Sequence, residues 1–236
     1  MHLIQTFKAN LSSIEEKIGY VFENKDLALN AFIHRSFVNE AKAEAPQHNE
    51  RLEFLGDSVL GLIIADFLYH RLPAYPEGKL SQLRAQLVDA ASCARYLKKL
   101  GFADQLLLGR GERMSEGHAK TSIQADAFEA LIAALYLDGG IQVVRSFLMA
   151  HFEEDFEQVI GSPPRNYKAE LQDYSQKKFQ KAPSYRVVEE TGPDHAKIFH
   201  VIVTVGDQEL GTGTGNSKKE AEQRAAFAAL AKITHE

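Results

Sequence analysis

Residues 49 to 58 read NERLEFLGDS, and this stretch decides how the first part of the chain folds. Glu50, Glu53 and Asp57 are separated by three and four residues, so on an α-helix their side chains fall within an arc of about 60°. Like charges one turn apart repel each other, and no lysine or arginine stands between them on that face. The spacing predicts a helix whose acidic face has a role beyond solvation.

The opposite face of this helix is apolar, and we expect it in a core: it carries Leu52, Leu55, Val59, Leu62 and Ile63. Beyond Asp57 the acidic face continues with Gly61 and Ile64 rather than with polar residues. A small and an apolar residue at these positions predict that another element packs closely there.

A second helix repeats this design in SIQADAFEALIAALYLDGG, residues 122 to 140. Asp126 and Glu129 lie on a face that continues with alanines, and no lysine or arginine occurs between Lys120 and Arg145. If the two acidic ends meet, four carboxylates share one site. Such a cluster is strongly unfavourable unless it holds a cation or retains protons.

The ligand chemistry of such a site favours Mg²⁺, or Mn²⁺ in its place. Carboxylate oxygens without cysteine or histidine neighbours select these ions over zinc. Their typical chemistry is displacement at phosphorus, with an activated water and a stabilised leaving oxygen. Glu77, in the turn YPEGKL, is a candidate outer ligand. The competing interpretations are ordinary surface acids and a di-iron helix bundle, but the latter requires Glu-x-x-His pairs, which the sequence lacks.

Composition places the chain among ordinary globular proteins. It has 236 residues, of which 44% are hydrophobic and 25% charged. A single cysteine, Cys93, excludes an internal disulfide and a cysteine-based zinc site, which favours the cytoplasm. We expect no membrane association, because the longest apolar run is too short to span a bilayer. The net charge of −5 argues mildly against a nucleic-acid partner for the chain as a whole.

The hydrophobic pattern predicts two domains joined by the linker IGSPPRNY. The first domain is expected to be all-α, because helical periodicity recurs in residues 11 to 21, 25 to 42, 49 to 71, 78 to 99, 121 to 137 and 140 to 159. The second is expected to be a small α+β domain with the order α-β-β-β-α. Its strands are SYRVVEE, KIFHVIVTV and QELGTGTG.

The last helix has a recognisable start. Ser217 and Glu220 form a capping box, and Lys218 and Lys219 follow the cap directly. Cations are unfavourable at a helix N-terminus unless an anion also binds there. The pattern therefore predicts a phosphate-binding position.

These motifs together resemble the ribonuclease III family. NERLEFLGDSVLGL resembles the family's signature stretch, and ADAFEALIAALYLDGG resembles its second acidic motif. IGYVFENKDLALNAFIHRSFVNE and EGKLSQLRAQLV are similar to further family segments. The resemblance implies an endonuclease domain in residues 1–159, a linker in 160–166 and a double-stranded RNA-binding domain in 167–236.

The family's activity follows as an expectation: a homodimer hydrolyses both strands of double-stranded RNA with Mg²⁺, leaving 5′-phosphates, 3′-hydroxyls and short 3′ overhangs. Processing of ribosomal RNA precursors and other structured transcripts is the implied role. A protein that binds duplex RNA without cutting it is the alternative, which the complete set of acids disfavours.

The resemblance also implies roles for single residues. The metal ligands are Glu53, Asp126 and Glu129; the catalytic acids are Asp57 and Glu129, supported by Glu50 and Glu77; the RNA contacts are Gln172, Asp173, His195, Lys218 and Lys219. Phe54 lies off the core stripe near Glu50 and is expected to enter the partner subunit. Two departures are Gln124, where an aliphatic residue is usual, and the weakly basic segment GHAKTS.

Overall fold

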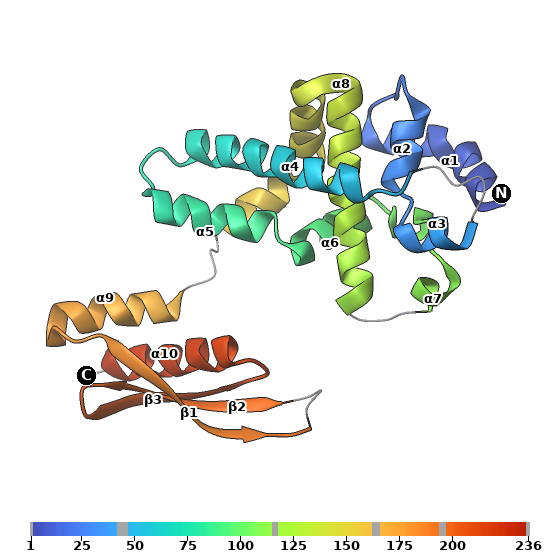
Figure 1. Ribbon diagram of the computed structural model, residues 1–236. Helices are drawn as coiled ribbons and strands as arrows, with labels where there is room; N and C mark the ends of the chain where they lie inside the picture. Colours follow the sequence, from blue (N-terminus) through green and yellow to red (C-terminus); the bar gives the residue numbers. More distant parts are fainter. Residues whose placement is uncertain (1, 42–46, 115–117, 162–165, 194–196, 235–236) are drawn as a thin grey trace. The chain divides into compact units, whose positions relative to one another are not determined.

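The computed structural model describes residues 2–41, 47–114, 118–161, 166–193 and 197–234, and the chain forms two compact units, residues 1–163 and 164–236 (Figure 1). The first unit is helical, which confirms the predicted class. Its elements are α1 (His2–Ile18), α2 (Lys25–Ala31), α3 (Arg35–Ala41), α4 (Glu50–Arg71), α5 (Glu77–Leu87), α6 (Ala90–Lys99), the 3-10 helix η1 (Ala103–Gln105), α7 (Arg110–Arg113) and α8 (His118–Gly161).

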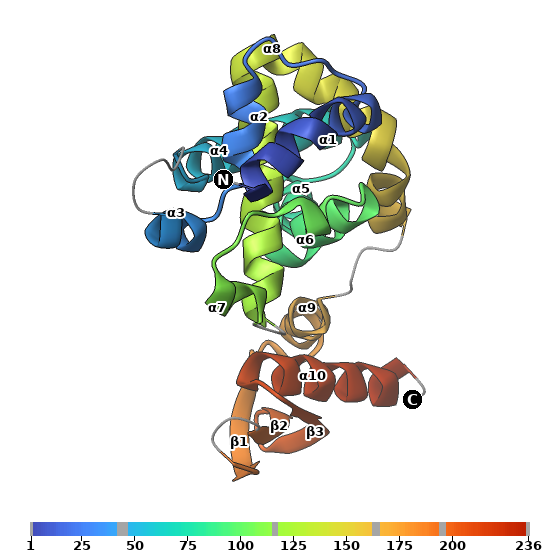
Figure 2. The ribbon, with the colours of Figure 1, turned by 90° about the vertical axis from the view of Figure 1, so that its right-hand side faces the viewer.

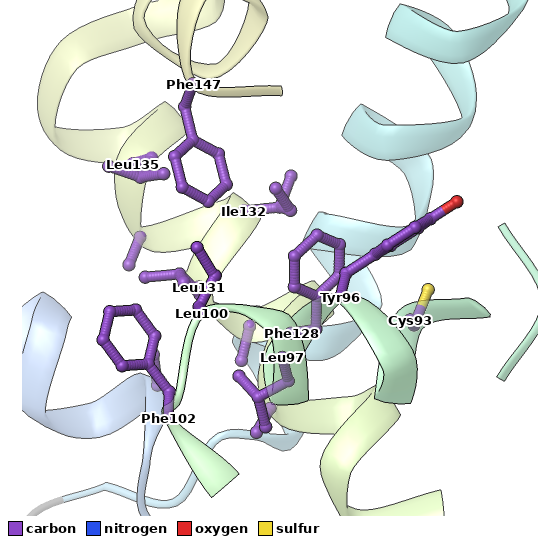
Figure 3. Close-up of a cluster of buried hydrophobic side chains, with 14 of the residues drawn as sticks. Cys93, Tyr96, Leu97, Leu100, Phe102, Phe128, Leu131, Ile132, Leu135 and Phe147 are labelled. Carbon is purple, nitrogen blue, oxygen red and sulfur yellow. The ribbon is translucent and has the colours of Figure 1, made fainter. Parts of the chain in front are cut away.

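Helix α8 is the centre of the first unit and packs most extensively against α4 and α6 (Figures 1 and 2). Phe128, Leu131 and Ile132 of α8 lie with Tyr96 and Leu97 of α6 in one buried cluster (Figure 3). Residues 120–161 are long and apolar enough to span a membrane by length and composition. Their apolarity has another explanation here, because this helix supplies the core.

A kink divides α8 at Gly140, whose φ of 78° lies in the left-handed region that glycine adopts without a Cβ penalty. The two halves correspond to the separate helices predicted for residues 121 to 137 and 140 to 159. Just before the kink, the Asp138 carboxylate accepts hydrogen bonds from the Tyr20 hydroxyl at 2.9 Å and from the backbone N–H groups of Glu23 and Asn24 at 2.7 and 2.9 Å. These bonds tie the turn after α1 to the kink.

Two helices predicted as continuous are broken, namely residues 25 to 42 and 78 to 99. The second break is local: the Asp89 side chain accepts a hydrogen bond from Ser92 N–H at 2.8 Å and starts α6 as its N-cap. The first break depends on a distant segment. Ile33 pairs with Leu107 in an isolated parallel bridge, and helical periodicity gives no sign of such a contact.

The predicted core face of α4 is wrong at one position. Val59 and Ile63 are buried as expected, but the side chain of Leu62 is 60% exposed. Phe54 and Tyr69 are also exposed and lie on the same side of the helix, since offsets of 8 and 15 residues correspond to about 80° and 60° of rotation. Helix α4 therefore has an uncovered apolar face, made of Phe54, Leu62 and Tyr69.

The second unit has the predicted α-β-β-β-α order. Its elements are α9 (Tyr167–Phe179), β1 (Pro183–Thr191), β2 (Ile198–Val205), β3 (Gln208–Gly215) and α10 (Lys218–Thr234). The strands form one antiparallel sheet in the order β1-β2-β3. Val201, Val203 and Val205 of β2 are buried on one face of this sheet.

Helix α10 lies directly on glycines of β3. A Cβ on Gly213 would be 2.2 Å from the backbone nitrogen of Ala225, and Gly211 and Gly215 meet other alanines of α10 in the same way. Only glycine permits this approach. The predicted cap of α10 is present: Glu220 N–H donates to Ser217 Oγ at 3.2 Å, and Glu220 Oε2 accepts from Asn216 N–H at 2.9 Å.

Candidate active site

The acidic faces of α4 and α8 meet where the two helices touch. A Cβ on Gly56 would lie 1.8 Å from the carbonyl oxygen of Glu129, so backbone packs on backbone at this point. Gly56 is flanked by Glu53 and Asp57 in the sequence, and Asp126 lies one turn before Glu129. The predicted close approach of the helices is present, although it occurs at Gly56.

Gly61, where we expected the neighbouring element, has nothing within 4 Å of the position of a Cβ. This part of the prediction was wrong. Gly56 lies between two of the acids, where the charge pattern gives no indication that a small residue is a contact point. The contact at Gly56 places the acids at the helix crossing rather than beside it.

The carboxylates at this helix crossing repel one another. They are here called the acidic cluster and belong to Glu53, Asp57, Asp126 and Glu129. Burial raises the pKa of Glu129 to about 7, and repulsion from Asp57, Asp126 and Glu53 adds to this effect. The pKa of Glu53 is raised by burial and then by Asp126, Glu50 and Asp57. Burial also raises the pKa of Asp126. Placing a cation among these groups would relieve the repulsion and favour their ionised forms.

The donor set of the acidic cluster suits a hard divalent cation, because its four side chains offer only carboxylate oxygens. Among the residues that the structure describes, no three histidine, cysteine, aspartate or glutamate side chains converge into a ready-made metal site. The structure thus brings the carboxylates into electrostatic contact without arranging them around one point. The acidic cluster therefore suits a divalent metal by its negative charge and by its carboxylate ligands.

The thiol of Cys93 is a neighbour of this cluster that the sequence did not suggest. Cys93 is fully buried on α6, where its thiol donates to the carbonyl of Val88 at 3.6 Å and lies close enough to Glu129 for each group to affect the pKa of the other. Burial raises the pKa of the thiol, and the charge of Glu129 raises it further. Cys93 is therefore a neutral neighbour of the carboxylate.

Glu50 and Glu77 occupy different places from the cluster. Glu50 Oε1 lies 3.0 Å from Arg35 Nη1 of α3, so a base from another helix compensates this acid. Glu77 is exposed in the first turn of α5, where its Oε1 accepts a hydrogen bond from Ser81 Oγ at 2.8 Å. The charge of Glu50 adds to the raised pKa values of Glu53 and Asp126, whereas the repulsion on Glu129 comes from Asp57, Asp126 and Glu53. Glu50 is thus a partly compensated acid at the start of α4, while Glu77 is an exposed acid on α5.

The predicted contacts of the second unit are exposed wherever they are described. Gln172 and Asp173 lie on the outer side of α9, and Lys219 is exposed at the start of α10. Lys218 is exposed as well, but its Nζ lies 3.3 Å from Glu190 Oε1 and over the ring of Phe199. His195 lies outside the described residues.

Comparison with known proteins decides the family. Residues 24–155 match the family model described as ribonuclease-III-like. The chain belongs to the ribonuclease III family. Residues 167–233 match the model of the double-stranded RNA binding motif, so this ribonuclease III family member carries both modules.

Relatives of this ribonuclease III family member match along almost their whole length. Ribonuclease 3 of Protochlamydia amoebophila is 53% identical over 221 residues, covering 94% of this chain and 91% of that protein. Ribonuclease 3 of Caldanaerobacter subterraneus subsp. tengcongensis is 46% identical, with 94% and 98% covered. Among solved structures, the nuclease domain of ribonuclease III from Campylobacter jejuni matches with a TM-score of 0.57 and 36% identity, covering 63% of this chain and 99% of that domain. That structure is described as flexible in a region involved in dimer formation.

Proposed function

We propose that this protein hydrolyses both strands of double-stranded RNA in a reaction that depends on Mg²⁺. As a member of the ribonuclease III family it is a double-stranded-RNA-specific endoribonuclease. The observation that carries the mechanism is the contact between Gly56 and the Glu129 backbone, which brings two acidic helix faces together. The Mg²⁺ requirement rests on the oxygen-only ligands and the mutual repulsion of the acidic cluster.

In this proposal the side chains of the acidic cluster have different roles. Glu53, Asp126 and Glu129 hold the cation, for which Mn²⁺ substitutes. When bound, the cation supplies an activated water and stabilises the oxygen that leaves phosphorus. Asp57 is the exposed acid beside them and orients the water, and Glu129 contributes to the same step. Glu50 and Glu77 support the positions of the RNA and the water from outside the cluster.

The second unit holds the duplex. A-form RNA presents phosphates and 2′-hydroxyls on its accessible surface, so such a module reads the shape of the duplex more than its sequence. We assign the phosphate contacts to Lys218 and Lys219, and further contacts to Gln172, Asp173 and His195. Lys218 must exchange Glu190 for a phosphate when RNA binds.

The exposed apolar face of α4 is where we place the partner subunit. Phe54, Leu62 and Tyr69 are 79%, 60% and 68% exposed, and a stripe of three large apolar side chains on one helix is unfavourable in water. The nuclease domain acts as a homodimer, with one acidic cluster per subunit and therefore one cut in each strand.

The remaining assignments follow the family. We propose domain limits of 1–159 and 167–236 with a linker in 160–166, products with 5′-phosphates and 3′-hydroxyls on short 3′ overhangs, and ribosomal RNA precursors and other structured transcripts as substrates in the cytoplasm. The match of residues 167–233 to the RNA-binding motif supports the start of the second domain.

One assay tests the nuclease function directly. A long RNA duplex is incubated with the protein in Mg²⁺, in Mn²⁺ and in chelator, and the fragments are sized on a denaturing gel. We expect short fragments with either ion and none with the chelator. Glu129→Ala should bind the duplex without cutting it, whereas Glu154→Ala, which changes an exposed acid elsewhere on α8, should cut normally. Binding without fragments from the unmodified protein would instead support the RNA-binding alternative.

A further inference from the structure

His34 is held beside the acidic cluster by its own backbone. Its N–H donates to the carbonyl of Leu107 at 3.1 Å, in the bridge that separates α2 from α3. The carbonyl of the preceding residue, Ile33, accepts a hydrogen bond from Asn49 N–H at 2.8 Å. Asn49 is the residue just before α4, the helix that carries Glu53. The ring therefore projects from a segment fixed to the start of the acidic helix.

Two charge interactions also place this segment beside the acidic cluster. The next residue, Arg35, pairs with Glu50 in the first turn of α4 at 3.0 Å. In addition, a positive charge on His34 would act on Asp126 of α8 and lower the pKa of that carboxyl group. His34 thus lies near enough to Asp126 of α8 to interact with its charge, on a segment that is also tied to the first turn of α4 through Arg35.

The hydrogen bonds of the ring determine which nitrogen carries the proton. The Nδ1 atom accepts from the N–H of Ser36 at 3.3 Å, so Nδ1 is unprotonated. Ser36 Oγ lies 2.8 Å from the same Nδ1 and itself accepts from Gly109 N–H at 2.9 Å. The hydroxyl proton is then free to point to Nδ1. The ring is neutral, and its proton is on Nε2.

Tight packing around Gly109 keeps this arrangement in place. A Cβ on Gly109 would lie 2.6 Å from Glu40 Oε1 and 2.9 Å from the carbonyl of Ser36. The same Glu40 oxygen accepts from Arg110 N–H at 2.8 Å. Only a glycine brings this segment close enough to α3 for its N–H to reach the serine hydroxyl.

The Nε2–H group is left without a protein partner among the described residues, although the rest of the ring is fully engaged. If its role were to hold Asp126, that hydrogen bond would already be in place. We propose that His34 is a further catalytic residue, whose Nε2–H donates a hydrogen bond to a phosphate oxygen of the RNA strand being cut. This assignment rests on the proposed nuclease function.

The physical advantage of such a donor lies in its neutrality. A phosphate entering an acidic cluster adds negative charge, and the charge on its oxygens grows in the transition state. A fixed N–H donor stabilises that charge and needs no rearrangement at the moment of reaction. Because it is neutral, it does not form an ion pair with a carboxylate of the cluster, as a lysine would.

The test measures single-turnover cleavage of a short RNA duplex by His34→Gln, His34→Asn and His34→Phe. A glutamine amide can place an N–H near the position of Nε2, whereas an asparagine amide reaches only the position of Nδ1. We expect the asparagine and phenylalanine variants to be slower by roughly 100-fold, the usual effect of losing one fixed donor. The glutamine variant should recover at least a tenth of the rate. His70→Asn, an exposed histidine at the other end of α4, should be unaffected.

Two further measurements separate a substrate contact from a structural role. Duplex binding without Mg²⁺, the far-UV circular dichroism and the half-saturating Mg²⁺ concentration should stay unchanged in all three variants. Ser36→Ala keeps the ring but removes its orienting hydroxyl, and should slow cleavage by about tenfold, since a misplaced donor loses part of its effect. This second variant keeps the assignment testable if replacement of the ring unfolds the protein.

Several results would overturn the assignment. A fast phenylalanine variant would show that the donor is dispensable, and a glutamine variant as slow as the asparagine variant would show that a donor at Nε2 is not what matters. Rescue of the slow variants by excess Mg²⁺ would mean that His34 acts through Asp126. Failure of the unmodified protein to cut would overturn the nuclease function itself, and the assignment with it; the other outcomes arise only in an active enzyme.

Discussion

Gly56 of α4 and Glu129 of α8 are in backbone contact, with space for a hydrogen atom and for nothing larger. Replacement of Gly56 by alanine places a methyl group 1.8 Å from the Glu129 carbonyl oxygen, so the helices must separate. We expect Gly56→Ala to lower the free energy of unfolding by about 1–3 kcal/mol, as overpacking does, and to abolish cleavage because the acids move apart. Urea unfolding and the duplex assay measure the two effects.

The matched control is Gly61→Ala on the same helix. Nothing lies within 4 Å of a Cβ at Gly61, so alanine should be neutral or stabilise the helix by about 0.5–1 kcal/mol. If both alanine variants behave alike, the close contact at Gly56 is not what joins the two acidic faces.

The apolar face of α4 predicts how the dimer can be broken. Leu62→Glu puts a charge among Phe54, Leu62 and Tyr69, and burying it against a partner subunit would be costly. We expect a monomer by sedimentation velocity at micromolar protein concentration, with cleavage reduced by at least tenfold, a loss of about 1.4 kcal/mol in transition-state stabilisation. Val21 is 69% exposed on another part of the same unit, and Val21→Glu should leave the dimer intact. A dimeric Leu62→Glu variant would place the interface elsewhere.

The lysines at the start of α10 predict a change in the salt dependence of RNA binding. Lys218→Ala combined with Lys219→Ala should weaken duplex binding and reduce the slope of log K against log salt by roughly 2, because two phosphate contacts are lost. Lys232→Ala, at the opposite end of the same helix, should leave the slope unchanged. Glu190→Gln should strengthen binding, because it frees Lys218 from its ion pair. A double alanine variant with an unaltered slope would refute the assignment of the phosphate contacts.

Asp138 predicts a pH effect on stability. Burial alone would raise the pKa of this carboxyl group, but the hydrogen bonds from Asn24, Glu23 and Tyr20 outweigh that effect and lower it. A lowered folded-state pKa contributes stability above the unfolded-state value, about 3.9, which is lost as the pH falls through the folded-state value. Asp138→Asn should therefore cost about 1–2 kcal/mol at pH 7 and progressively less below pH 4.

Urea unfolding followed by circular dichroism at pH 7 and at several values below pH 4 measures this effect. Glu154→Gln, an exposed acid beyond the kink, serves as the comparison. A constant difference between Asp138→Asn and the unmodified protein across this range would show that the carboxylate does not stabilise the turn after α1 through its charge.

Much of this architecture could be predicted from periodicity. The helical class of the first unit and the α-β-β-β-α order of the second both follow from repeats of 3.6 and 2 residues, which are local properties. The hydrophobic periodicity does not show the helix breaks near residues 33 and 89, and the reasons differ. Asp89 ends one helix and starts the next within an unbroken apolar pattern, while the break near Ile33 depends on Leu107, more than seventy residues away.

The sequence indicates the acids of the site but not the groups that surround them. Charge pattern marked Glu53, Asp126 and Glu129, since like charges at helical spacing without neighbouring bases are unusual. Nothing in the local sequence of Arg35 or Cys93 indicates that one pairs with Glu50 and that the other lies beside Glu129. These partners come from separate helices, and only packing decides which side chains face each other.

What the sequence determined by itself was which faces of the helices are acidic, apolar or small, because a helix converts residue spacing directly into angle. The tertiary structure decided where those faces meet. It selected Gly56 rather than Gly61 as the crossing point, left Leu62 exposed beside Phe54, and oriented His34 through a serine and a glycine from two other segments. Helix crossings depend on the shapes of both surfaces at once, and that information is not contained in the periodicity of either helix alone.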